Sequence, residues 1–117
     1  MEDCVLIVDT NALSKRHLSL VNQLALAHNT AGAFVLFVQV VGPRTTATEA
    51  TRLKRLGFNF DELVILEEDH KEFEDQAVLA FADKTRRSMS SNVILLTGSG
   101  MVFSKALNMG MEVLLYG

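Results

Sequence analysis

The sequence contains a single cysteine, a single proline and no tryptophan, and none of its apolar runs reaches the roughly 18 residues needed to span a bilayer. Cys4 has no second cysteine with which to form an internal disulfide. The sequence also lacks a secretory leader pattern, in which a charged start precedes an apolar stretch and a cleavage site. These absences predict an intracellular protein, cytoplasmic or nuclear, with no membrane partner.

Three motifs that would announce a cofactor are absent as well. There is no GxGxxG fingerprint for a dinucleotide, and no lysine follows Gly98-Ser99-Gly100 where a P-loop requires one. The three histidines have no metal-ligand spacing relative to one another or to Cys4, so no zinc site is expected. The net charge of −3 argues against holding nucleic acid by bulk electrostatics, but leaves room for local basic patches.

What the sequence does contain is a series of short apolar runs that alternate with helical patterns over a length suited to one domain, residues 1–117. The runs predict five strands, at residues 4–9, 33–41, 62–66, 92–97 and 111–116. Four helices are expected at 14–28, from Thr45 or Thr46 to 56, at 71–87, and from the turn at 98–100 to about 110. This alternation predicts an α/β fold: a single three-layer α/β/α domain with a five-stranded, mostly parallel sheet of flavodoxin-like alternation.

Two expectations about packing follow from the same patterns. The third helix should bury Phe73, Ala77, Ala80 and Phe81 on one face. All seven phenylalanines, Phe34 among them, are expected in the core or at its edge, which leaves no exposed platform for base stacking.

Polar side chains follow the first and third predicted strands. Asp9 and Asn11 come directly after an apolar run, and Glu72 and Asp75 lie three residues apart on the helix that leaves the third strand. Parallel sheets collect ligands outside the carboxyl ends of their strands, so Asp9 with Asp75, or with Glu72, would form half of a Mg²⁺ or Mn²⁺ site. The alternative is that the acidic run 67–75 is a solvated helix start whose acids complement the helix dipole.

A glycine turn, Thr97-Gly98-Ser99-Gly100, follows the fourth strand. Backbone N–H groups in such a turn can bind an anion at the start of a helix. The alternative is that the glycines only make a tight connection. The sequence leaves both interpretations open.

At this point the chain resembles the PIN-like nuclease superfamily, and within it the NYN domains. The resemblance covers nearly the whole chain and depends on four short segments: Val8-Asp9-Thr10-Asn11, the acidic helix 74–83, the apolar strand with its glycine turn at 92–100, and the closing helix and strand at 106–117. It implies RNA as the substrate class, a divalent metal as cofactor, Asp9 and Asp75 as catalytic residues, and Asp9, Asp75 and Glu72 as metal ligands. Asn11, Thr97, Ser99, Lys15 and Arg16 are then the expected substrate contacts.

One departure from the family pattern concerns the turn after the fourth strand. Family members place two aspartates there, where this sequence has Ser99 and Met101. Without these charges the carboxylates would hold a metal weakly or not at all.

Three hypotheses remain open from the sequence. The first is a ribonuclease-fold domain of RNA metabolism that has lost most catalysis and binds single-stranded RNA, a protein partner or a second copy of itself. The second is an active Mg²⁺- or Mn²⁺-dependent endoribonuclease, and the third an unrelated flavodoxin-like domain that binds a phosphate or nucleotide. A homodimer is expected from the slight apolar surplus and from the family's habit of pairing. Whether any nuclease activity survives, and which RNA or partner is bound, the sequence does not determine.

Overall fold

The computed structural model describes residues 4–42, 50–88 and 92–116. Five strands form one sheet: β1 (Cys4–Asp9), β2 (Phe34–Val41), β3 (Glu62–Glu67), β4 (Asn92–Thr97) and β5 (Glu112–Leu115). The helices are α1 (Leu18–Thr30), α2 (Ala50–Leu56), α3 (Glu74–Ser88) and α4 (Gly100–Asn108), and short 3₁₀ turns, η1 (Lys15–His17) and η2 (Lys71–Phe73), precede α1 and α3. The predicted α/β fold is confirmed, and the element boundaries agree within a few residues.

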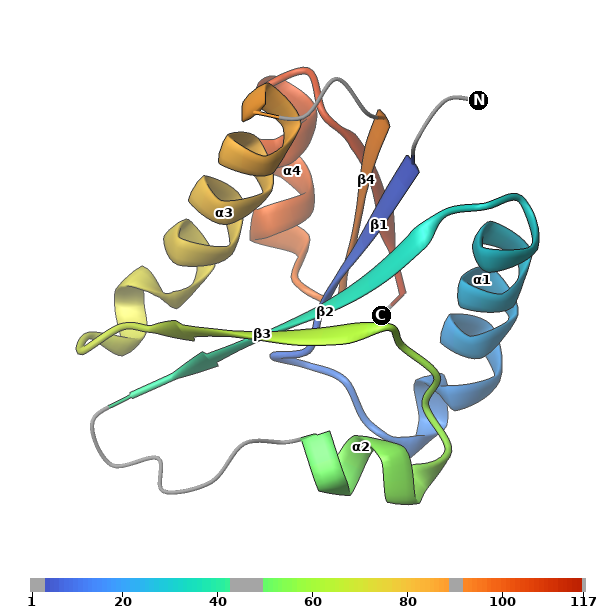
Figure 1. The fold of residues 1–117 in the computed structure, drawn as a ribbon. Helices are drawn as coiled ribbons and strands as arrows, with labels where there is room; N and C mark the ends of the chain where they lie inside the picture. Colours follow the sequence, from blue (N-terminus) through green and yellow to red (C-terminus); the bar gives the residue numbers. More distant parts are fainter. Residues whose placement is uncertain (1–3, 43–49, 89–91, 117) are drawn as a thin grey trace.

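The strand order is β3-β2-β1-β4-β5, and every pair is parallel. Figure 1 shows α1 and α2 on one side of this sheet and α3 and α4 on the other. We call these the α1 side and the α3 side. Because β1 is central and covered on both sides, its residues 5–9 are all buried, which explains why its sequence is continuously apolar rather than alternating.

The sheet separates two clusters of buried apolar residues. On the α1 side, Leu6 and Val8 pack with Val21 of α1 and Leu53 of α2. On the α3 side the cluster contains residues of the sheet, of α3 and of α4: Ile7, Val38, Leu95, Val78, Leu79, Ala82, Val102 and Ala106. Each fully buried side chain of this size contributes roughly 1.5–3 kcal/mol relative to an exposed one, so these clusters are what holds the layers together.

Gly57 ends α2 as the sequence predicts. Its φ of 102° lies in the left-handed region, and Phe58 N donates to Leu53 O across the helix end. The start that was predicted for this helix, at Thr45 or Thr46, lies outside the described residues.

Two packing predictions were wrong in part. The buried face of α3 carries Val78, Leu79 and Ala82, and the half-buried Phe81 packs against the same cluster as predicted. Ala80 is exposed, however, and Phe73 is 41% exposed. Phe73 belongs to the 3₁₀ turn η2, whose period of three residues per turn does not continue the phase of the helix that follows.

Phe34 is 44% exposed, and was also misplaced. It begins β2 two residues before Leu36, the first residue that pairs with β3, and its ring lines an open hollow of about 510 Å³ together with Phe81 and Thr85 of α3. The seven phenylalanines therefore divide between core and surface.

No helix among the described residues is long and apolar enough to cross a membrane.

Candidate functional site at the carboxyl ends of beta1 and beta4

The fold has one topological switch point, between β1 and β4. The chain leaves β1 toward β2 through α1 and leaves β4 toward β5 through α4, on opposite sides of the sheet (Figure 1). In open parallel sheets the crevice outside the carboxyl ends at such a point is the usual ligand site. Here the two strand ends meet directly, because the Thr97 hydroxyl donates to Asp9 Oδ2 at 2.8 Å.

Asp9 is almost fully enclosed at this point, with 1% of its surface exposed. Its Oδ1 accepts from Asn11 N at 3.0 Å, and Thr97 bonds the other oxygen. Burial raises the pKa of Asp9; the hydrogen bonds from Asn11 and Thr97 oppose this, and the charges of Asp75 and Glu74 add to it. A carboxylate held in this way costs stability, which is typical of residues retained for function.

Asp75, in the first turn of α3, meets the turn after β4. Ser99 Oγ lies 3.4 Å from Asp75 Oδ2, within weak hydrogen-bonding distance. The same Oγ accepts from Val102 N and so caps α4, while Ser99 N donates to Thr97 Oγ1. A continuous chain of polar contacts thus runs from Asp9 through Thr97 and Ser99 to Asp75.

In the glycine turn, close packing against Tyr116 and Ala12 requires a glycine at position 98. A Cβ on Gly98 would lie 2.6 Å from Tyr116 Cε1 and 2.9 Å from Ala12 Cβ, whereas one on Gly100 would meet nothing within 4 Å. Because Ser99 N and Val102 N are bonded inside the turn, the geometry favours the tight-connection interpretation over an anion-binding loop.

The acids near Asp9 are Asp75 and Glu74. Glu74 lines a polar hollow of about 270 Å³ with Thr10, Asn11 and Gln39. Glu72, one of the three predicted metal ligands, lies in η2 with an exposed side chain. The structure therefore brings Asp9 and Asp75 together as predicted, and places Glu74 beside them.

A metal ion would have few protein ligands here. Within residues 4–42, 50–88 and 92–116, no group of three or more histidines, cysteines, aspartates or glutamates could hold one. Met101, where the family pattern has an acid, is 58% exposed and offers no oxygen. Asp9 and Asp75 are the acids that the contacts across the switch point bring together, and a cation beside them would need water or substrate oxygens for the rest of its shell.

Cationic side chains border the same edge. Lys15 and Arg16 are exposed on η1, shortly after Asn11, and Arg52 of α2 lines the hollow with Glu74. Arg16 Nε lies 3.2 Å from Nε2 of His17, a buried residue whose pKa is lowered by burial and by the Arg16 charge.

Tyr116, which directly follows β5, also contacts this site, although no sequence pattern selected it. Its hydroxyl donates to the main-chain oxygen of Asp9 at 2.7 Å, and its ring contacts His17 edge-on at 4.8 Å between centroids. Gln39 and Arg52 were likewise not among the predicted site residues, whereas Glu74 was an alternative to Glu72 for completing the metal shell of an active endoribonuclease. A glutamine within the apolar run of the second strand was the one signal available.

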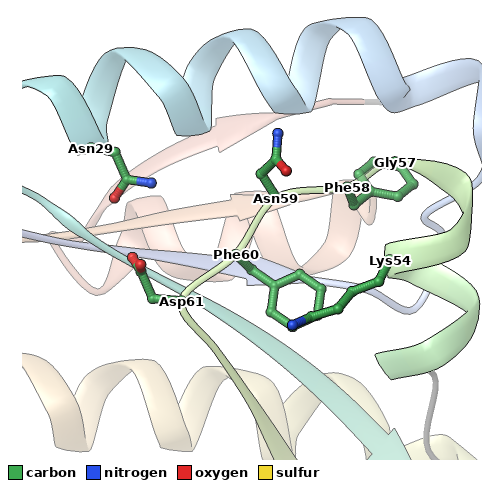
Figure 2. Close-up of a pocket in the computed structure, with 7 residues that line it drawn as sticks. All are labelled: Asn29, Lys54, Gly57, Phe58, Asn59, Phe60 and Asp61. Carbon is green, nitrogen blue, oxygen red and sulfur yellow. The ribbon is translucent and has the colours of Figure 1, made fainter.

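A larger hollow of about 400 Å³ lies at the opposite, amino edge of the sheet, between α1, α2 and the segment before β3. Figure 2 shows the stem of Lys54 beside the Phe60 ring, with Nζ 5.2 Å from the ring centroid. Asp61 accepts from Val35 N at 2.7 Å and so fixes the start of β3 against β2. These contacts are structural, and the hollow brings no group of acids together.

No protein-family model matches this sequence, and no curated protein or solved structure matches it either. The fold and the site geometry are therefore what any functional proposal depends on.

Proposed function

We propose that this protein is a PIN-like, NYN-type ribonuclease-fold domain of RNA metabolism that binds single-stranded RNA at the carboxyl edge of its sheet, with impaired catalysis. The observation that carries this proposal is the chain of contacts from Asp9 through Thr97 and Ser99 to Asp75 across the switch point. It joins two carboxylates at the edge where open parallel sheets usually bind ligands, and a serine stands where the family pattern has a third acid.

The impairment follows from charge. Hydrolysis of a phosphodiester assisted by metal needs cations that activate water and stabilise the leaving oxygen, and carboxylates hold those cations. Both carboxylate oxygens of Asp9 already accept hydrogen bonds, from Asn11 and Thr97, and Ser99 supplies no charge. Mg²⁺ or Mn²⁺ binding is expected to be weak or absent.

Binding of RNA is supported by the cations beside the acids. Lys15 and Arg16 are exposed on η1, shortly after Asn11 in sequence, and Arg52 lines the hollow together with Thr10. An RNA strand whose phosphates contact these side chains would also lie next to Asn11, Thr97 and Ser99. The polar groups of these three residues would orient the sugar-phosphate backbone of the RNA. Because the net charge is −3, binding would be local and steeply dependent on salt.

The first test measures binding and cleavage of one labelled single-stranded RNA. We expect fluorescence anisotropy to show binding in EDTA, and gels to show no cleavage in Mn²⁺. Reversing both Lys15 and Arg16 to glutamate should weaken binding about tenfold or more, since two phosphate contacts become repulsive. Reversing Lys84 and Lys105, exposed on α3 and α4, changes the net charge equally and should have little effect.

Equal losses in the two double variants, or no binding at tens of micromolar protein, would contradict the proposal. Cleavage that requires Mn²⁺ and is abolished by Asp9→Asn would instead support the second candidate, an active endoribonuclease in which Glu74 joins Asp9 and Asp75. The observation that favours this candidate is that Glu74 and Asp75 both lie close enough to Asp9 for their charges to raise its pKa.

A further inference from the structure

An open hollow of about 510 Å³ lies on the α3 side of the sheet, toward the amino ends of the first three strands. It lies at the opposite end of β1 from Asp9, and it is larger than the polar hollow beside that residue. Apolar side chains from three strands and one helix line it: Val5, Phe34, Leu36, Val64 and Phe81. Concave, mostly apolar sites of roughly 300–1,000 Å³ are where proteins bind small organic molecules.

The strand order explains why this space is open. β3 is an edge strand, and the chain that leaves it passes β2 and β1 before it pairs again as β4 (Figure 1). α3 lies along this crossover and packs against β2 and β4. The hollow therefore lies between the second half of α3 and the amino ends of β2 and β3, and no described strand beyond β3 closes its outer flank.

The hollow has a buried floor and partly exposed walls. Val5 and Leu36 are buried and form the floor, whereas Val64 and Phe81 are half-buried. Phe34 is the most exposed of the apolar residues that line it. A molecule that covers Phe34 and contacts Phe81 would remove apolar surface from water, which is the main driving force for binding in such a site.

The polar side chains of Glu62 and Thr85 also line the hollow, and both are placed to accept hydrogen bonds. Glu62 precedes Val64 by two residues on β3, so the two side chains lie on the same side of the sheet. The Thr85 hydroxyl donates its proton to Phe81 O at 2.8 Å, which leaves its oxygen as an acceptor. Among the described residues that line the hollow, Glu62 is the only charged one. A ligand that suits these groups donates hydrogen bonds and carries positive charge.

We propose that this hollow binds a small organic cation, an ammonium group on an aromatic body. The aromatic body would lie against Phe34, Leu36 and Phe81, where ring edges and faces pack together. The ammonium group would lie beside the exposed carboxylate of Glu62 at the open rim and donate to it. This inference does not depend on the proposal that the domain binds RNA.

Charge separates this class of ligand from others of the same shape. An aromatic carboxylate would bring a second negative charge beside Glu62, and an uncharged aromatic molecule would gain nothing from that residue. Because Glu62 is exposed, its ion pair with a ligand is partly screened by water and salt. The preference for a cation is therefore modest, about fivefold at low salt and less at high salt.

The test uses three probes that share one aromatic body and differ in the head group: naphthylethylamine, naphthylethanol and naphthylpropionate. Each is titrated into isotope-labelled protein, and binding is measured from amide chemical shifts in NMR spectra. We expect shifts at Val5, Leu36 and Thr85, and none at Asn11 or Ser99. The amine should bind about fivefold more tightly than the alcohol, and the carboxylate should bind most weakly.

Two variants of β3 identify the carboxylate responsible. Glu62→Gln should abolish the preference for the amine over the alcohol. Glu67→Gln is the matched control, because it removes the same charge from an exposed position at the other end of β3, outside the hollow, and it should keep the preference. Phe34→Ala should weaken binding of all three probes about fivefold or more, since it removes an exposed wall of the site.

No shifts at the hollow with any probe at millimolar concentration would overturn the proposal. Equal binding of the amine and the alcohol, or tighter binding of the carboxylate, would overturn the assignment of a cation. Loss of the preference in both glutamine variants would attribute it to net charge and remove the role given to Glu62. The same spectra show whether each variant is folded, and failure of RNA binding would leave these outcomes unchanged.

Discussion

At the scale of single residues, Asp9 keeps a carboxylate inside the sheet with both oxygens hydrogen-bonded. Its neighbours Thr97, Asn11 and Tyr116 belong to three different parts of the chain. An aspartate in this setting is balanced between two effects, since burial disfavours its charge and the hydrogen bonds favour it. The net direction, a raised pKa, means that the folded protein carries this charge at a cost.

That cost makes a pH-dependent prediction for Asp9→Asn. Because the folded-state pKa of Asp9 is raised, the wild type loses stability as pH rises through the interval between the ordinary aspartate value and the raised one. The uncharged asparagine variant loses no stability over this pH interval. At neutral pH the free energy of unfolding of Asp9→Asn, measured by urea denaturation, should therefore exceed that of wild type by about 1 kcal/mol. This difference should vanish at acid pH. An Asp9→Asn variant that is less stable than wild type at neutral pH, with a deficit that shrinks as pH falls, would show that the charge stabilises the fold.

At the scale of elements, the turn from β4 into α4 carries much of the site. Ser99 caps α4, reaches Asp75 on α3, and donates its N–H to Thr97 at the end of β4. The other end of α4 is tied to α3 as well, because Arg86 Nη1 donates to Met109 O while Arg86 and Arg87 pair with Asp83. These pairs lower the pKa of Asp83.

The two glycines of this turn should respond differently to alanine. Gly98→Ala places a methyl group against the buried Tyr116 ring, so we expect a loss of about 2 kcal/mol or more. Gly100→Ala meets open space at the first position of α4 and should be neutral, or stabilise by up to about 1 kcal/mol. Thermal unfolding of both variants tests the pair, and equal losses would argue against the Tyr116 contact as the cause.

At the scale of the whole molecule, the sheet topology decides which residues share a site. The Thr97–Asp9 contact joins positions 88 residues apart in sequence, and Asp75 arrives from a third element. Ser99 is the position where one further acid would bring three carboxylates around the same point.

Ser99→Asp should consequently create a metal site. Aspartate is a good N-cap, so α4 keeps its start, while the added charge beside Asp75 and Asp9 is repulsive until a cation binds. Calorimetry should show Mn²⁺ binding that is undetectable or much weaker in wild type. At a hundredfold excess over Kd the ion should stabilise the variant by about 2.7 kcal/mol. Adding Asp9→Asn should remove this gain. If Ser99→Asp does not bind Mn²⁺, the carboxylates at positions 9, 75 and 99 cannot reach a common ion.

The sequence by itself determined the strands, the helices and the parallel α/β class, because these depend on local patterns: continuous apolar runs, helical spacing, and glycines such as Gly57 that end helices. It also placed Asp9 and Asp75 at the ends of elements that meet at one sheet edge. The tertiary structure alone decided that Tyr116 and Gln39 lie at that edge, that Glu74 rather than Glu72 is the acid near Asp9, that Ser99 caps α4 beside Asp75, and that Phe34 and Phe73 are exposed. These facts depend on strand order, on the phase change at η2 and on which flanks neighbouring elements cover. Such contacts between distant segments leave no periodic signal in the chain.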